Sequence, residues 1–238
     1  MNLTRGVQER LAETLAAIDD AAERVGRAGE VTLVAVTKTV HPDLILEAYR
    51  CGQRVFGENR VQEGVEKIGL LAPDMPDAAW HLIGHLQSNK AKQAVAAFPV
   101  IESVDSLRLA ARLDRYAESA GFRPQILLEL NVPGEASKSG FSLEALRRAI
   151  PTLLGLQHLE LRGLMTIAPL VSDPEEVRWV FRVLRQLRDE IRDGYSIPGF
   201  DELSMGMSGD FQVAIEEGAT MVRIGRALFG ARQQGRTG

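Results

Sequence analysis

The stretch that decides the fold is VTLVAVTKTV, residues 31–40, in which a run of apolar and β-branched residues ends in Lys38. Such a continuous apolar run is typical of a strand that is buried on both faces, as in a parallel sheet. Lysine is among the residues least often found inside a protein, because removing an ammonium group from water costs free energy. We therefore predict that a buried strand ends here and that Lys38 has a chemical role.

Seven further short apolar runs follow, and segments with the 3.6-residue spacing of amphipathic helices lie between them. The predicted strands span residues 31–37, 54–57, 80–83, 100–104, 126–132, 159–167, 202–205 and 221–224. Eight strand–helix units in about 210 residues favour an α/β fold in the form of a closed, TIM-like (β/α)8 barrel. An open, doubly wound sheet is the alternative.

The chain before the first strand, residues 1–27, has apolar residues at helical spacing and predicts an extra N-terminal helix. This helix could cover the flank of the barrel or mediate a dimer. No linker or change in composition divides the sequence, so we expect residues 1–238 to form a single domain. We expect residues 231–238 to be a flexible tail.

Composition excludes several classes of function. The net charge of −4 gives no electrostatic support for binding nucleic acid or an anionic membrane. The N-terminal segment has no continuous apolar run, so we expect neither a signal peptide nor a membrane span. A single cysteine, Cys51, suits a reducing cytoplasm. His81 and His85 are four residues apart, but they lie on a predicted strand without a third ligand, so we expect no metal site.

Polar residues and glycines gather where the predicted strands end. In a (β/α)8 barrel these ends meet at one mouth, which is where ligands bind. The residues at these ends are Lys38, Glu58, Asn59, His85, Ser103, Asn131, Thr166, Ser204, Arg223 and Gly225.

The loops after the last two strands, in SMGMSGDF and RIGRALFG, are rich in glycine and precede short helices. Backbone N–H groups in such loops can approach an anion closely, and these two loops are the usual phosphate site of the barrel. Each loop taken alone could simply make a tight turn.

A phosphate site together with a lysine at the end of the first strand suggests a phosphorylated carbonyl compound that is held as an imine. Partial burial of Lys38 should lower the pKa of its amine, and the neutral amine is the nucleophile in Schiff-base chemistry. Of the other lysines, Lys67, Lys90 and Lys92 lie in helical segments and are expected on solvated faces, whereas Lys138 lies in a loop that could cover the mouth.

The motifs VAVTKTV, FGENRVQE, WHLIGHLQSNK, LRGLMTIAP, ELSMGMSGDF and VRIGRALFG, in this order, closely resemble the YggS/PROSC family of pyridoxal phosphate (PLP) homeostasis proteins. The resemblance runs from about residue 31 to residue 230. The family is similar to the N-terminal barrel of bacterial alanine racemase, which belongs to fold type III of PLP proteins.

The resemblance implies a set of cofactor-binding residues, with Lys38 holding PLP as an internal aldimine. It places Ser204, Met205, Gly225 and Arg226 around the phosphate. Arg226 is a departure, because a small hydroxyl residue is common there and only the backbone donor transfers. The remaining implied residues are Asn59, His85 and Met165 beside the ring and Arg223 on the last strand.

Arg223 interrupts an otherwise apolar strand, where an unpaired guanidinium would be costly. It could form a salt bridge with an acidic neighbour. If instead it faces the pyridine nitrogen of PLP, its positive charge opposes protonation there and weakens the ring as an electron sink. Carbanion chemistry would then be poorly supported.

A racemase needs acid/base groups on both faces of the substrate, and in alanine racemase the second group is a tyrosine from across a dimer. Here Tyr49 and Tyr116 lie in predicted helices and Tyr195 lies in a predicted loop, so none ends a strand. The resemblance therefore favours a monomeric, cytoplasmic PLP carrier without significant turnover, whose partners are PLP and unidentified PLP-dependent apoenzymes. A PLP-dependent amino acid racemase and a class I aldolase are the alternatives.

Overall fold

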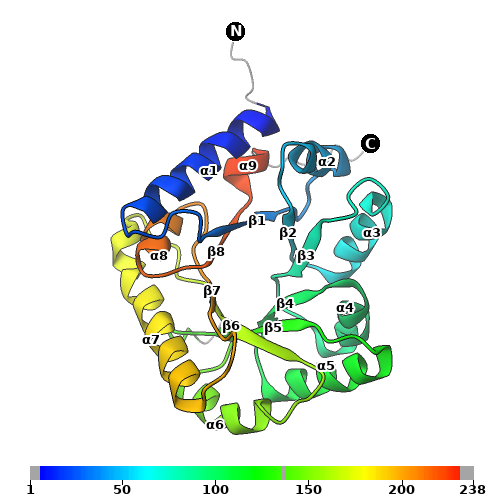
Figure 1. Ribbon diagram of the computed structural model, residues 1–238, viewed down its shortest axis with the longest axis vertical. Coiled ribbons are helices and arrows are strands. Elements are labelled where there is room, and N and C mark those ends of the chain that lie inside the picture. The colour runs from blue at the N-terminus through cyan, green and yellow to red at the C-terminus, as the bar shows by residue number, and fades with distance from the viewer. Residues whose placement is uncertain (1–5, 136–137, 231–238) are drawn as a thin grey trace.

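The structure of the protein, a computed structural model, describes residues 6–135 and 138–230 (Figure 1). Within these residues, eight parallel strands pair in chain order and close into a barrel. The last strand pairs with the first, with Thr32 opposite Met221 and Ala35 opposite Ile224. The strands are β1 (Thr32–Val36), β2 (Val55–Glu58), β3 (Ala79–Leu82), β4 (Val100–Val104), β5 (Gln125–Leu130), β6 (Glu160–Thr166), β7 (Glu202–Ser204) and β8 (Met221–Ile224).

Helices surround the ring of strands (Figure 1). They are α1 (Val7–Glu23), α2 (Pro42–Arg50), α3 (Val61–Leu71), α4 (Ala91–Ala97), α5 (Leu107–Ala120), α6 (Leu143–Leu153), α7 (Arg178–Tyr195), α8 (Phe211–Glu216) and α9 (Arg226–Phe229). Two short 3₁₀ helices, η1 (Ser88–Lys90) and η2 (Pro174–Val177), complete the described elements. The closed barrel predicted from the sequence is confirmed, and the open-sheet alternative is excluded.

Local sequence explains several helix boundaries. The Ser106 and Ser142 hydroxyls accept hydrogen bonds from backbone N–H groups in the first turns of α5 and α6. These bonds satisfy donors that have no partner within the helix. Pro42 begins α2, where its missing N–H costs nothing. Gly121 ends α5 with φ of 63°, a left-handed conformation that glycine adopts without steric cost.

The barrel separates two apolar layers. The larger layer lies between the strands and the surrounding helices, and it includes Phe56, Phe98 and Phe181. The smaller layer fills the barrel interior, as expected when alternate residues of each strand point inward. Its members are Val34, Val36, Ile83, Val100, Leu127, Met165 and Met221.

Helix α1 covers the flank of the barrel beside the last strands. It contacts α8 and α9, and Leu11 and Ile18 are buried on its inner face (Figure 1). Arg10 Nε also donates a hydrogen bond of 2.7 Å to Leu228 O, which ties α1 to α9. Of the two arrangements predicted for this helix, coverage of the flank is confirmed.

The predicted strands agree with the observed ones to within two residues at each end. The predicted flexible tail, residues 231–238, lies outside the described residues. The assignment of the whole chain to one domain stays a prediction. In the described part of the chain, no helix combines the length and the apolar character needed to cross a membrane.

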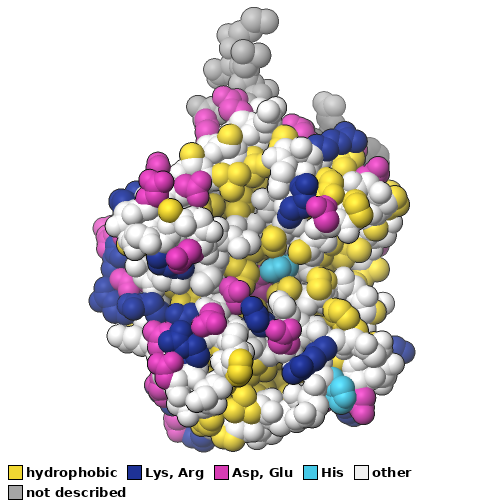
Figure 2. All heavy atoms as spheres, viewed as in Figure 1, with side chains coloured by type: hydrophobic (Ala, Val, Ile, Leu, Met, Phe, Trp, Pro, Cys, Tyr) yellow, Lys and Arg dark blue, Asp and Glu magenta, His cyan; other side chains and the backbone are white. Residues whose placement is uncertain are grey.

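Charges of both signs are mixed on the surface (Figure 2). They are densest along the edge where α7 runs, and there Arg178 and Arg182 both form ion pairs with Glu217. The arginines of α7 are therefore largely neutralised by neighbouring carboxylates rather than forming a basic patch.

Candidate functional site

Lys38 lies at the C-terminal mouth of the barrel, two residues beyond the end of β1. Its side chain is partly buried, and the preceding Thr37 is fully buried. The chain then turns sharply, with Val40 N–H donating to Thr37 O at 2.9 Å. Thr39 has φ of 61°, which is uncommon for a residue other than glycine. The predicted position of Lys38 at the mouth of a buried strand is therefore what the structure shows.

The glycine loop after β8 lies against the strand that carries Lys38. A Cβ atom added at Gly225 would lie 3.1 Å from Val36 O, so a larger residue would push the two strand ends apart. The neighbouring loop after β7 turns at Gly206, which has φ of 95° and packs tightly on Ala214. Barrel closure thus brings the predicted phosphate loop at Gly225 beside the turn that carries Lys38, and the loop at Gly206 follows the next strand of the ring.

Two residues predicted at the phosphate are engaged elsewhere. Ser204 is fully buried, and its hydroxyl donates to Glu102 Oε2 at 2.5 Å and accepts from Arg223. Met205 donates its N–H to Met221 O, and its side chain packs in the outer apolar layer. The Ser204 hydroxyl and the Met205 N–H thus have partners within the barrel, and their assignment to the phosphate stays a prediction.

A chain of hydrogen bonds runs through the barrel interior, and we call its four residues the barrel network. His81 Nδ1 lies 2.6 Å from Glu102 Oε1, and Ser204 joins Glu102 to Arg223. Arg223 Nη1 donates to Ser204 Oγ at 2.6 Å, and Nη2 donates to Thr166 O at 2.7 Å. The predicted salt bridge of Arg223 is therefore indirect, because the serine hydroxyl stands between the guanidinium and the carboxylate.

Electrostatics in the barrel network follow from this bonding. Burial alone would raise the pKa of Glu102, but hydrogen bonding to His81 and the nearby charges of His81 and Arg223 lower it below the ordinary value. Burial lowers the pKa of Arg223, whereas the charges of Glu102, Asp210 and Glu129 act in the opposite direction. Glu102 is thus held ionised inside the barrel.

Three polar atoms near the strand ends are buried without a hydrogen-bond partner among the described residues: Glu58 Oε2, Asn59 Oδ1 and Glu129 Oε2. Glu58 is bonded through its other oxygen to Lys67 and Thr37, and we call the remaining two atoms, Asn59 Oδ1 and Glu129 Oε2, the open acceptors. Burial, followed by the charge of Asp105, raises the pKa of Glu129 to about 7. Buried polar atoms normally have a partner, so such exceptions are candidates for contact with a ligand or an ordered water.

Asn59 is held in place by the backbone of the next strand's loop. A Cβ atom at Gly84 would lie 2.3 Å from Asn59 O, so only glycine allows the two loops to approach so closely. His85, the next residue, is half-exposed at the rim. Its Nδ1 lies 3.1 Å from Asp105 Oδ2 and 3.1 Å from Ser139 Oγ, which links three loops.

The other predicted residues divide between the interior and the rim. Met165 is fully buried in the inner apolar layer, and Arg226 is exposed at the start of α9. Thr166 and Ser103, also noted at strand ends, are buried and donate to Leu130 O and Gly84 O. These two hydroxyls therefore link strand ends rather than facing the mouth.

Lys67 is not on a solvated face, contrary to the sequence-based expectation. Its side chain is 9% exposed, and its ammonium donates to Glu58 Oε1 at 2.8 Å and to Glu63 Oε1 at 2.7 Å. Sequence reasoning missed this cluster because Glu63 and Lys67 have the spacing of an ordinary surface pair on a helix. The buried Glu102 and Glu129 were also missed, although a carboxylate inside an apolar strand was the available signal.

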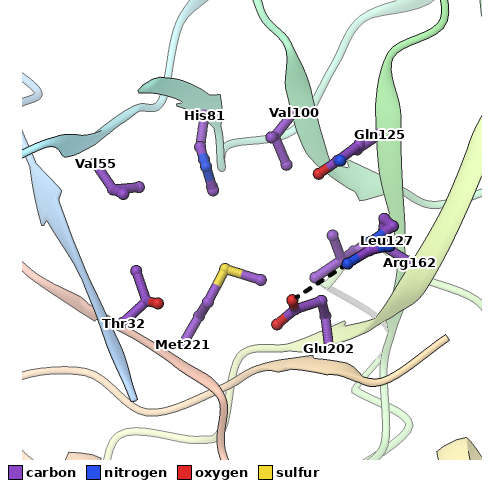
Figure 3. Close-up of a pocket in the computed structure, with 9 residues that line it drawn as sticks. All are labelled: Thr32, Val55, His81, Val100, Gln125, Leu127, Arg162, Glu202 and Met221. Atoms are coloured by element: carbon purple, nitrogen blue, oxygen red, sulfur yellow. Dashed lines mark ion pairs between the residues drawn. The ribbon is translucent and has the colours of Figure 1, made fainter. Parts of the chain in front are cut away.

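A cavity of about 190 Å³ opens at the opposite, N-terminal mouth of the barrel (Figure 3). His81 and Gln125 point into it, and Arg162 and Glu202 lie 3.9 Å apart at its side. The lining residues are mostly the first inward-facing residues of their strands: Thr32, Val55, His81, Val100, Gln125, Leu127, Arg162, Glu202 and Met221. None of the residues predicted to bind a cofactor lines this cavity, and His81 connects it to the barrel network.

No tyrosine reaches the mouth that carries Lys38. Tyr49, Tyr116 and Tyr195, all in the described ranges, lie on α2, α5 and α7 outside the barrel. Tyr195 is the last residue of α7, not a loop residue as predicted. In the ranges that the structure describes, no three His, Cys, Asp or Glu residues form a group that could hold a metal ion.

Comparison with known proteins gives consistent results. The family model described as alanine racemase, N-terminal domain, matches residues 12–233. A pyridoxal phosphate homeostasis protein of Aquifex aeolicus is 46% identical over 227 residues, which cover 94% of this chain and 98% of that protein. A pyridoxal phosphate homeostasis protein of Escherichia coli is 41% identical over 231 residues, which cover 95% of this chain and 97% of that protein.

Solved structures extend the comparison. PipY of Synechococcus elongatus, solved with PLP bound, is 42% identical with a TM-score of 0.84, covering 94% of this chain and all of that one. An alanine racemase of Clostridium difficile is 15% identical with a TM-score of 0.66, covering 93% of this chain and 57% of that one. The second likeness shows that the racemase contains the same barrel fold.

Proposed function

Since this chain belongs to the family of alanine racemase N-terminal domains, we propose that it binds pyridoxal 5'-phosphate and acts in the homeostasis of that cofactor. The names of its 40–46% identical relatives and the PLP-bound state of PipY support this assignment. The observation that carries it here is the closure of β1 against β8, which brings Lys38 and the loop at Gly225 together at one mouth.

The residues present fit the cofactor. When bound, PLP supplies an aldehyde that condenses reversibly with a lysine amine and releases water. We assign that amine to Lys38. Backbone N–H groups of the loops at Gly206–Gly209 and Gly225–Arg226 would hold the phosphate, because such loops expose donors to an anion. The open acceptors support the fit, since they are buried polar atoms for which the fold provides no donor.

We propose that Asn59, His85 and Met165 lie beside the pyridine ring of PLP. We propose that Arg223 limits the chemistry of that ring. The guanidinium of Arg223 is fixed by hydrogen bonds to Ser204 and Thr166, and the charges of Glu102, Asp210 and Glu129 favour its charged form. A fixed positive charge near the pyridine nitrogen would oppose protonation there, which weakens electron withdrawal from a substrate. The role of this chain is therefore binding and supply of PLP rather than turnover.

The racemase alternative is not favoured. Racemisation needs a second acid/base group opposite the lysine, and the tyrosines lie on helices outside the barrel. We also propose that the protein is a cytoplasmic monomer and that PLP-dependent apoenzymes receive the cofactor. Coverage of the barrel flank by α1 supports the monomer, because its apolar face is already buried within the chain.

An absorbance experiment tests the proposal. Wild type mixed with PLP should turn yellow and bleach on borohydride treatment, whereas Lys38→Ala should bind PLP without the covalent absorbance band. Lys92→Ala, which changes an exposed lysine on α4, is the matched control and should behave as wild type. A persistent band in Lys38→Ala would move the attachment to another lysine, with Lys138 the first to test.

An activity assay separates carrier from racemase. The PLP-loaded protein should racemise alanine and other amino acids far more slowly than about 1 per second, the lower end of ordinary enzyme turnover. Turnover at or above that rate would contradict the carrier function and would support a racemase.

A further inference from the structure

Both peptide groups that flank Lys38 are hydrogen-bonded to side chains of α3. The Lys67 ammonium donates to Thr37 O at 2.6 Å, and that carbonyl belongs to the peptide before Lys38. The Thr39 N–H belongs to the peptide after Lys38, and it donates to Glu63 Oε1 at 2.6 Å. Because the backbone dihedrals of a residue are set by its two flanking peptide planes, these bonds fix the direction in which the Lys38 side chain leaves the backbone.

The two α3 side chains belong to one buried cluster, which we call the Lys67 clamp and define as Glu58, Glu63 and Lys67. Lys67 bridges the two carboxylates at 2.8 Å and 2.7 Å. Thr37 Oγ1 adds a further bond of 2.7 Å to Glu58 Oε1. The turn after β1 is therefore joined to β2 and α3 through a continuous set of charge-assisted hydrogen bonds.

Burial distinguishes the clamp from an ordinary surface ion pair. The exposed fractions of the side chains are 9% for Lys67, 0% for Glu58 and 24% for Glu63. Glycine at position 64 lets α3 pack closely here: a Cβ atom there would lie 2.4 Å from the Phe98 ring and 3.3 Å from Glu58 Cβ on β2. Burial raises the pKa of Glu58, whereas hydrogen bonds from Lys67 and Thr39 lower the pKa of Glu63 in spite of burial.

Packing alone does not explain a charged cluster at this position, because apolar residues of similar volume often replace a buried ion cluster without loss of stability. What the charges add here is the pair of bonds from Lys67 and Glu63 to the peptides that flank Lys38. The turn also holds Thr39 in a left-handed conformation, which persists only where the surroundings enforce it. The hydrogen bonds and the enforced turn therefore both act on Lys38, which lies between Thr37 and Thr39.

We propose that Lys67, together with Glu58 and Glu63, is a positioning residue that aims the Lys38 amine for covalent capture of PLP. This inference rests on the proposed function. Capture joins Lys38 Nζ to the aldehyde carbon of PLP, and the aldehyde oxygen leaves as water. Preorganised direction favours this step because misplacement of a reacting group by a fraction of an ångström slows bond formation.

The test separates covalent capture from recognition of the phosphate. Pyridoxamine 5'-phosphate has an amine in place of the aldehyde, so it reports binding at the same site without a bond to lysine. In Lys67→Met we expect capture of PLP to slow by about tenfold or more, while the affinity for pyridoxamine 5'-phosphate stays at the wild-type value. Borohydride trapping at timed intervals measures capture, and equilibrium titration measures affinity.

Two further variants keep the result interpretable. Glu63→Ala removes the acceptor of Thr39 but leaves Lys67 paired with Glu58, so it should fold if Lys67→Met does not, and it should also slow capture selectively. Leu113→Ala removes a fully buried side chain of α5 and destabilises the fold without changing the turn that carries Lys38. It should leave the ratio of capture rate to pyridoxamine 5'-phosphate affinity unchanged.

The PLP-free protein gives a second readout. Hydrogen–deuterium exchange at the Thr39 amide should be faster in Lys67→Met than in wild type. Capture at the wild-type rate in both clamp variants, or an equal loss of capture and of pyridoxamine 5'-phosphate binding, would overturn the inference and leave the proposed function standing. Failure of wild type to form any covalent bond would overturn the proposed function, and the exchange measurement would still decide whether the clamp holds the turn.

Discussion

Two glutamates face the interior of the barrel, Glu102 on β4 and Glu129 on β5, and they are in opposite states. Glu102 is bonded to His81 and Ser204 within the barrel network, and its pKa is lowered. Glu129 has a buried oxygen without a partner, and its pKa is raised to about 7. The two side chains are almost equally buried, so hydrogen bonding and neighbouring charge, rather than burial, separate them.

The difference shows where the fold completes its own polar contacts and where it does not. The barrel network joins four strands and leaves its glutamate fully satisfied, as expected of a structural element. The open acceptors lie nearer the strand ends, toward the mouth that carries Lys38. Unsatisfied groups at that mouth are consistent with a site that a ligand completes.

The same substitution at both glutamates should change stability in opposite directions, and the larger effect is expected at Glu102. Glu102→Gln removes the carboxylate that acts most strongly on the buried Arg223 and turns an amide donor toward the Ser204 hydroxyl or His81. We expect a loss of about 3–5 kcal/mol in the free energy of unfolding at pH 7, measured by urea denaturation of the PLP-free protein. An unchanged free energy would mean that the barrel network does not stabilise the fold.

Glu129→Gln should stabilise the PLP-free protein at high pH. The folded-state pKa of Glu129 lies above the unfolded-state value, so its contribution is fully present below about pH 4.5 and is lost as the pH rises through about 7. Relative to the variant, wild type should therefore lose about 3 kcal/mol between these limits. Parallel stability curves of wild type and variant from pH 5 to pH 8 would contradict the assignment of Glu129 as an unsatisfied acid.

The smallest effect is expected at the exposed rim. Arg226→Thr supplies a hydroxyl where the family resemblance expects one, and a hydrogen bond of about 1 kcal/mol would tighten binding of pyridoxamine 5'-phosphate by about fivefold. Because Arg226 is exposed, the free energy of unfolding should not change. Weaker binding in Arg226→Thr would show that the arginine side chain itself holds the phosphate.

The sequence allowed prediction of the strands and of Lys38 because both depend on local pattern. A buried parallel strand is a continuous apolar run, and a charged residue within or after such a run is conspicuous. The same signal drew attention to Arg223, which is buried and hydrogen-bonded in the barrel. A charged residue within an apolar run was also present at Glu102 in VIESV and at Glu129 in LELN. The prediction instead chose the neighbouring Ser103 and Asn131, because they come at the strand ends.

The partners of these residues could not be predicted, because they depend on how strands distant in sequence register across the barrel. Ser204 and Met205 were assigned to the phosphate by motif, yet Ser204 bonds a glutamate 102 residues away in sequence and Met205 pairs with β8. Lys67 has the helical spacing of a solvated pair with Glu63, but it is buried where α3 packs closely on the barrel at Gly64. Burial of a helix face is a tertiary property that the spacing of its charges does not reveal.

Peptide mapping identifies the lysine that binds PLP covalently. PLP-loaded wild type is reduced with borohydride, digested, and analysed by mass spectrometry for the lysine that carries the reduced cofactor. We expect the modification on the peptide that contains Lys38 and its absence from peptides that contain Lys67 or Lys138. Modification mainly at a lysine other than Lys38 would contradict the assignment of the amine to Lys38.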